Sequence, residues 1–178
     1  TILSGGSQAS GFGDDDTSVF SAIQFVDENT GWVAGVRITP STQGQETLIQ
    51  KTVDGGQTWV KQPTNTEDIL EDIYFVNATT GWAVGENGVI FATTDGETWK
   101  ALSSGSEEKL RSVRFIDTET GWAVGGDMGV NVILHTTDGG QNWADQSSGK
   151  LFAYDIFSLD DNHIWLTGQN AIIMKYAK

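Results

Sequence analysis

Short stretches in which apolar and polar residues alternate recur along the whole chain. Four of them carry β-branched and aromatic side chains, and they lie at 20–26, 70–76, 110–116 and 153–159. Alternation with a period of two is typical of a strand that buries one face. A polar, turn-forming segment follows each stretch, at 27–29, 77–79, 117–119 and 160–162. The pattern therefore predicts four copies of a strand and a turn, and no window shows a sustained helical period.

A phrase of glycine, tryptophan, two small or apolar residues and glycine follows each turn. It occurs at 31–35, 81–85 and 121–125, with a weaker copy at 164–168. This phrase predicts a second strand, and the residues after it predict a third strand at 47–51, 89–93 and 132–136. An Asp-Gly turn then leads into a fourth strand that opens at Trp59, Trp99 or Trp143.

Self-similarity at a regular period predicts a repeat architecture. Each copy is a four-stranded antiparallel meander of about 40–45 residues, the size of one propeller blade. We therefore predict an all-β fold, a β-propeller with about four blades in a single domain over 1–178. The predicted blades are 19–62, 68–103, 109–147 and 151–178, the last completed by 1–7.

The two ends of the chain suggest how such a ring could close. The last repeat stops at Lys178 before a fourth strand, and residues 1–7 resemble 100–106, which open a fourth strand. An N-terminal strand added to the last blade would close the ring and remove an exposed sheet edge. Two alternatives are a piece of a propeller with six to eight blades, and two chains that join as halves of one ring. A homo-oligomer is expected if one chain does not close its own ring.

Composition and charge narrow the possible functions. The chain has 178 residues, 38% of them hydrophobic, and a mean hydropathy of −0.26, as expected for a soluble globular domain. Its apolar runs are too short to span a bilayer. The chain has no cysteine, which excludes disulfides and thiolate chemistry. A net charge of −14 argues against nucleic acid and anionic membranes as partners.

The turn before the fourth strand carries a recurrent motif, Thr-x-Asp-x-Gly-x-Thr-Trp. It is complete at 52–59, Asn142 replaces the second threonine at 136–143, and the copy at 93–99 is one residue shorter. The motif resembles the Asp-box, also called the bacterial neuraminidase repeat. Together with the Gly-Trp phrase, residues 19–178 resemble the photosystem II assembly-factor-type repeats of many secreted bacterial proteins.

This resemblance implies a β-propeller and leaves the function open, because sialidases, xyloglucanases, sorting receptors and assembly factors share such repeats. Assembly factors of the family grip a partner polypeptide, so the resemblance implies a protein segment as partner. It also implies an extracellular, periplasmic or cell-surface location.

The box residues are predicted to be structural. An aspartate in a turn can accept hydrogen bonds from the backbone of that turn, and a large aromatic ring packs against neighbouring strands. This interpretation covers Asp54, Trp59, Asp95, Trp99, Asp138 and Trp143. The tryptophans of the Gly-Trp phrase are predicted to pack between blades.

Candidate ligand-binding residues lie where the repeats differ and become polar, at the start of the innermost strands. We predict that this face, near the propeller axis, binds a protein segment or a carbohydrate. The candidates are Glu71, Asp72, Arg111, Tyr154 and Asp155, with Tyr74 and Arg114 on the same strands and Arg37 in an insertion at 37–46. The alternative is a solvated rim in which Arg111 pairs with Glu71 or Asp155.

Two further classes of function stay open. A glycosidase-like enzyme, or a fragment of one, would use carboxylates such as Asp72 and Asp155, about 5–9.5 Å apart. A structural repeat module of a larger surface assembly would need no site. No catalytic residue, metal site or cofactor is predicted, because His135 and His163 are isolated and the acidic turns match no known calcium loop.

Overall fold

Four antiparallel sheets follow one another along the chain. The structure is a computed structural model that describes residues 17–40, 42, 44–127, 129–147, 152–169 and 172–176. The first sheet contains β1 (Thr17–Phe25), β2 (Gly31–Thr39), β3 (Gly44–Thr52) and β4 (Val60–Gln62). The second contains β5 (Leu70–Phe75), β6 (Gly81–Gly85), β7 (Ile90–Thr93) and β8 (Lys100–Leu102).

The third sheet contains β9 (Leu110–Phe115), β10 (Gly121–Gly125), β11 (Val132–Thr136) and β12 (Ala144–Asp145). The fourth has three strands, β13 (Ala153–Asp160), β14 (His163–Gly168) and β15 (Ile172–Tyr176). A short 3₁₀ turn, η1 (Glu86–Gly88), lies between β6 and β7. No helix in this part of the chain is long and apolar enough to cross a membrane.

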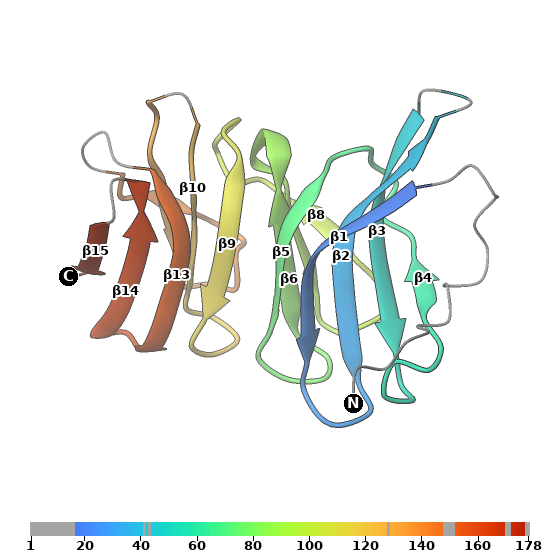
Figure 1. Ribbon diagram of the computed structural model, residues 1–178. Coiled ribbons are helices and arrows are strands. Elements are labelled where there is room, and N and C mark those ends of the chain that lie inside the picture. The colour runs from blue at the N-terminus through green and yellow to red at the C-terminus, as the bar shows by residue number, and fades with distance from the viewer. Residues whose placement is uncertain are drawn as a thin grey trace.

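The sheets stand side by side in chain order, and we call them blades one to four. Figure 1 shows their first strands, β1, β5, β9 and β13, in a row from right to left, and β5 and β9 contact both neighbours in this row. The all-β prediction with four antiparallel sheets is confirmed. Among the described residues, no sheet combines strands from both ends of the chain. The predicted closing strand at 1–7 lies outside the described residues.

Two predicted boundaries are wrong. The predicted strands at 31–35 and 47–51 are longer in the structure, because Arg37, Ile38 and Thr39 pair with Glu46, Gln45 and Gly44 and extend the β2–β3 hairpin into the insertion at 37–46. The alternation of β-branched residues continues through Thr39 and ends before Pro40, which explains the longer strands. The fourth strands begin one residue after each box tryptophan, at Val60, Lys100 and Ala144.

The glycines of the Gly-Trp phrase are required by close packing. A Cβ on Gly81 would lie 2.5 Å from the Phe75 ring. A Cβ on Gly85 would lie 2.0 Å from the carbonyl oxygen of Ile69, beside the irregular pairing between Leu70 and Asp72. The inner strand therefore passes too close to β6 for any side chain at either position.

Each blade is joined to the next by a tryptophan. The Trp32 ring stacks on Phe75 of blade two at 3.7 Å, and the Trp82 ring stacks on Phe115 of blade three at 3.4 Å. These rings are buried in the hydrophobic clusters between blades. At the third junction Trp122 packs in a cluster with Ile164, which occupies the place of the first glycine of the phrase. The tryptophans of the phrase thus form the packing between blades.

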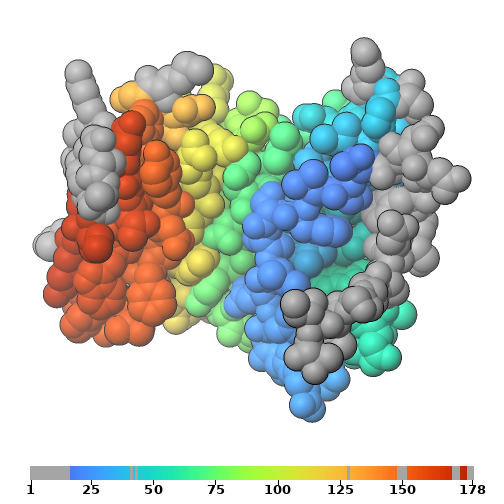
Figure 2. Space-filling view, in the orientation of Figure 1, coloured from blue at the N-terminus to red at the C-terminus, as the bar shows by residue number. Residues whose placement is uncertain are grey.

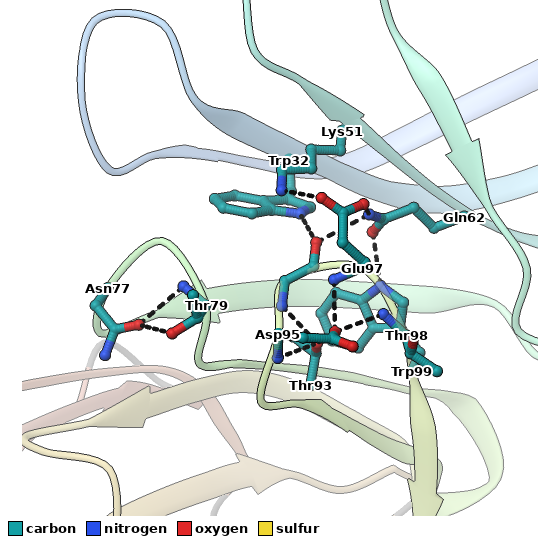
Figure 3. Close-up of polar contacts among 11 residues, drawn as sticks. Trp32, Lys51, Gln62, Asn77, Thr79, Thr93, Asp95, Glu97, Thr98 and Trp99 are labelled. Atoms are coloured by element: carbon teal, nitrogen blue, oxygen red, sulfur yellow. Dashed lines mark hydrogen bonds and ion pairs between the residues drawn. The ribbon is translucent and has the colours of Figure 1, made fainter.

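The box turns also join neighbouring blades. The Trp32 indole donates to the carbonyl of Gly96 in the next box turn at 3.3 Å, and Trp82 donates to Gly139 at 3.0 Å. Figure 3 shows the first of these junctions, where Gln62 donates to Gly96 and to Glu97 and accepts from the Trp99 indole. The box turns of blades two and three therefore contact the preceding blade as well as ending their own hairpins.

Candidate functional site

The box aspartates are saturated by their own turns. The Asp54 carboxylate accepts from the Thr58 backbone N–H at 2.9 Å, the Thr58 hydroxyl at 2.6 Å and the Thr52 hydroxyl at 2.8 Å. These bonds lower the pKa of Asp54 to about 2, the side-chain bond from Thr58 having the largest effect. Turn bonds also lower the pKa of Asp95 and Asp138. These hydrogen bonds stabilise the turn and leave the box carboxylates little acceptor capacity for a ligand.

The lowered pKa values predict a pH dependence of stability. A carboxyl group with a pKa lower in the folded state stabilises the fold above its unfolded pKa of about 4, and this contribution is lost as pH falls through the folded value. We expect the melting temperature of the native chain to fall between about pH 4 and pH 2. Asp54→Asn should lower the melting temperature at pH 7 and flatten this acid-induced fall.

Circular dichroism melts from pH 2 to pH 7 measure both effects. Glu28→Gln removes one exposed carboxyl group from the neighbouring turn and serves as the control for net charge. Parallel curves for the native chain and Asp54→Asn would show that this turn carries no pH-dependent stability.

At the other end of the inner strands, polar side chains from three blades meet. Asp72, Ser112 and Asp155 occupy the same place in β5, β9 and β13. The Ser112 hydroxyl lies 3.0 Å from Oδ2 of Asp72 and 2.8 Å from Oδ1 of Asp155. A hydroxyl has one proton and can donate to one of these carboxylates at a time. The structure thus brings together two predicted site residues through a serine that was not among the predicted binding residues.

The Arg114 guanidinium offsets one of the two negative charges in this cluster. It pairs with Oδ2 of Asp72 at 2.7 Å, lies 3.9 Å from Oδ1 of Asp155, and covers the Tyr74 ring at 5.2 Å. Asp72 also accepts from the backbone N–H groups of Ile73 and Val113. Both oxygens of Asp72 are therefore bound by the protein, and this carboxylate joins blade two to blade three.

Asp155 is more accessible than Asp72. Its side chain is 61% exposed, against 15% for Asp72. Oδ1 of Asp155 accepts from Ser112 and from the Ile156 backbone, whereas Oδ2 accepts no hydrogen bond from the described residues. One acceptor oxygen therefore faces solvent beside the Arg114 cation.

Arg111 and Tyr154 form a second pair on the same end of the blades. The guanidinium of Arg111 covers the Tyr154 ring at 5.7 Å and donates through Nε to the carbonyl of Gly126 at 3.4 Å. The Tyr154 side chain is half exposed. Within the described ranges, no carboxylate lies within ion-pair distance of Arg111, so the alternative that it pairs with Glu71 or Asp155 is wrong.

The remaining predicted residues lie apart from these pairs. Glu71 pairs with Lys109 at 2.6 Å, and Lys109 also lies 3.5 Å from Glu86. Lys109 precedes the predicted strand by one residue, so the strand pattern did not point to it. Arg37 lies on the long β2–β3 hairpin and pairs with Glu46 at 3.6 Å. The predicted site thus divides into a central cluster, an Arg111–Tyr154 pair and a separate hairpin.

The chemistry of this face suits a polar ligand. It offers guanidinium donors, one carboxylate acceptor and two tyrosine rings. Figure 2 shows this side of the molecule, with the surfaces of β5 and β9 between those of β1 and β13. No three histidine, aspartate or glutamate side chains of the described residues converge as a metal site.

Comparison with known proteins found a family whose repeats agree with the bladed architecture. A family model described as photosynthesis system II assembly factor YCF48 matches residues 57–151. A search of the curated proteins found no match.

Solved structures with the same fold include two of YCF48. One, described as YCF48 bound to D1 peptide, has a TM-score of 0.66 and 18% identity over 95% of this chain and 57% of that one. YCF48 from Cyanidioschyzon merolae has a TM-score of 0.66 and 17% identity over 89% of this chain and 50% of that one. The chain therefore spans about half the length of these structures.

A third similar structure is the GH74 enzyme of Niastella koreensis. It has a TM-score of 0.64 and 17% identity over 84% of this chain, but the match covers only 26% of that enzyme. Identities this low show a shared propeller-type fold and nothing about activity. The family model, in contrast, matches more than half of the chain. From its sequence and its blades, the chain belongs to the photosynthesis system II assembly factor YCF48 family.

Proposed function

We propose that this chain is a non-catalytic binding protein that holds an extended segment of another protein across the starts of β9 and β13. The observation that carries the proposal is the Arg111–Tyr154 pair beside the exposed carboxylate of Asp155. This group combines a hydrogen-bond donor, an acceptor and an aromatic surface, which together fit the main chain and one side chain of a peptide.

The bonding state of these residues supports binding. Arg111 has five N–H donors, and the described residues take only the one on Nε. Its guanidinium can therefore donate to a peptide carbonyl or carboxylate. Oδ2 of Asp155 can accept from a peptide N–H, and the half-exposed Tyr154 ring provides apolar contact. A similar structure is described as YCF48 bound to D1 peptide, so the fold is compatible with a peptide ligand.

The enzyme alternative is less well supported. Ser112 holds the carboxylates of Asp72 and Asp155 close together, as a glycosidase would require. Asp72, however, is bound through both oxygens to protein groups, which leaves it no free oxygen for a substrate. A carbohydrate ligand and an extracellular, periplasmic or surface location stay predictions from the sequence resemblance.

Peptide selection tests the proposal. Random peptides displayed on phage would be selected on the chain, and the best one synthesised for titration calorimetry. We expect Arg111→Ala and Tyr154→Ala each to weaken its binding at least about tenfold, a loss of about 1.4 kcal/mol. The melting temperature should change little, because both residues lie at the surface end of the strands.

Arg37→Ala is the matched control, since it removes an arginine from the separate hairpin and should leave the affinity within about twofold. Equal affinities for Arg111→Ala and the native chain would rule out this binding face. If no peptide binds, a glycan array and a glycosidase assay on the same protein show whether a sugar ligand or an enzyme replaces the proposal.

A further inference from the structure

The two end blades each expose a face that is buried in the other blades. We call the face that a blade turns toward the preceding blade its leading face, and the face turned toward the next blade its trailing face. In the part of the chain that the structure describes, no further blade packs on the leading face of blade one or on the trailing face of blade four. Figure 1 shows these two blades at opposite ends of the row.

The trailing face of blade four exposes residues whose equivalents in the other blades are buried by the next blade. Ile49, Ile90, Ile133 and Ile173 hold the same register position in their sheets. The first three are buried by the following blade, whereas Ile173 is 77% exposed. Trp165 holds the place of the three junction tryptophans and is only partly buried. Phe157, paired with Trp165, is 55% exposed.

The leading face of blade one carries the other half. Phe75 and Phe115, which receive the tryptophan of the preceding blade, are buried, whereas the equivalent Phe25 is 39% exposed. Ile23 is 62% exposed, although its equivalent in blade two, Ile73, is buried. Phe25 meets its own box tryptophan, Trp59, edge to face at 6.0 Å, as Phe75 and Phe115 meet theirs, and lacks only the stacking ring.

The two exposed faces are therefore complementary. The trailing face of blade four presents a tryptophan and an isoleucine without the phenylalanine on which they would pack. The leading face of blade one presents that phenylalanine without its stacking tryptophan. Large apolar side chains that stay exposed where their equivalents are buried point to an interaction site. The contact they would make is the one that already repeats inside the chain, so the chemistry of the partner is that of another blade of this repeat.

We propose that the occupant is a second copy of this chain. The trailing face of blade four in each copy packs on the leading face of blade one in the other, with Trp165 stacked on Phe25. Two such identical contacts related by a two-fold axis close a ring from two half-rings.

Light scattering after size exclusion tests the association. We expect a mass about twice the 19.2 kDa of one chain. Ile23→Glu on the leading face and Ile173→Glu on the trailing face each place a charge in the contact. Each variant alone should elute as a monomer, with an unchanged melting temperature in dilute solution, since both positions are mostly exposed in the single chain.

Mixing the two variants gives the decisive result. The intact trailing face of Ile23→Glu can pack on the intact leading face of Ile173→Glu, so an equal mixture should recover a dimer held by one contact. Val53→Glu is the matched control. Val53 is 66% exposed in the box turn, and the equivalent Thr94 and Thr137 are exposed in the interior blades as well. This variant should dimerise like the native chain.

Three outcomes would overturn the proposal. A native chain that stays monomeric at about 100 μM, well above a micromolar dissociation constant, would mean that further blades of a longer polypeptide, or the chain's own ends, cover these faces. Dimers that both variants retain would place the contact elsewhere. An open ladder of growing oligomers would show head-to-tail contact without closure into a ring of two.

Discussion

Replacing Phe115 by alanine should lower the free energy of unfolding by about 3–5 kcal/mol, the range for removing a large buried aromatic side chain. The Phe115 ring is almost fully buried, stacks on Trp82 at 3.4 Å and meets Trp143 edge to face at 5.9 Å. It also covers Gly121, which has no side chain to fill the space that alanine would leave. The loss therefore opens a cavity between blades two and three.

Urea denaturation followed by tryptophan fluorescence measures this change. Phe115→Leu is the control, because it keeps most of the apolar volume and should cost less than about 1.5 kcal/mol. A loss below about 1 kcal/mol for Phe115→Ala would mean that the blades repack freely, and that the stacked pair does not hold the junction.

Gly85→Ala should destabilise the fold at or above the upper end of the range of about 1–3 kcal/mol that is typical of overpacking. The added methyl group would lie 2.0 Å from the carbonyl oxygen of Ile69, and backbone cannot move aside as a flexible side chain can. The backbone of Gly85 is extended, with φ of −169°, so the cost is steric and not conformational. Equivalent glycines at 35, 125 and 168 approach a carbonyl oxygen in the same way.

Gly44→Ala provides the comparison for this variant. Gly44 begins β3, and among the described residues an added Cβ would meet the Thr42 hydroxyl at 3.1 Å, which can rotate away. We expect a change within about 0.5 kcal/mol, as for ordinary surface substitutions. Similar thermal melts for Gly44→Ala and Gly85→Ala would contradict the assignment of these glycines to close strand packing.

Much of the fold was predictable because the same pattern of strands and turns recurs in every repeat. Alternation along each inner strand, followed by a turn and the Gly-Trp phrase, predicted the order and pairing of strands in each blade. The stacking of Trp32 on Phe75 follows the same logic, since large apolar residues at fixed places in a repeat must be buried against the neighbouring repeat. The extension of the β2–β3 hairpin was missed because the insertion at 37–46 has no counterpart in the other repeats, although Ile38 and Thr39 continue the strand pattern.

The candidate site was only partly predictable. The sequence pointed to Asp72, Asp155, Arg111 and Tyr154 because the repeats become polar there. It could not show that Arg111 lies on Tyr154 or that Arg114 pairs with Asp72, because these partners are about 40 residues apart in the chain and meet only where adjacent blades are packed.

The sequence by itself determined the type of fold, the number of repeats and the residues that build each blade. These features depend on the alternation of apolar and polar residues, on turn-forming residues and on periodicity, all of which can be read along the sequence. Only the tertiary structure decided which polar residues pair, that the box turns of blades two and three accept a hydrogen bond from the tryptophan of the preceding blade, and that apolar side chains stay exposed on blades one and four. Those features arise from contacts between blades, whose geometry depends on how the sheets stack rather than on the order of residues within any one of them.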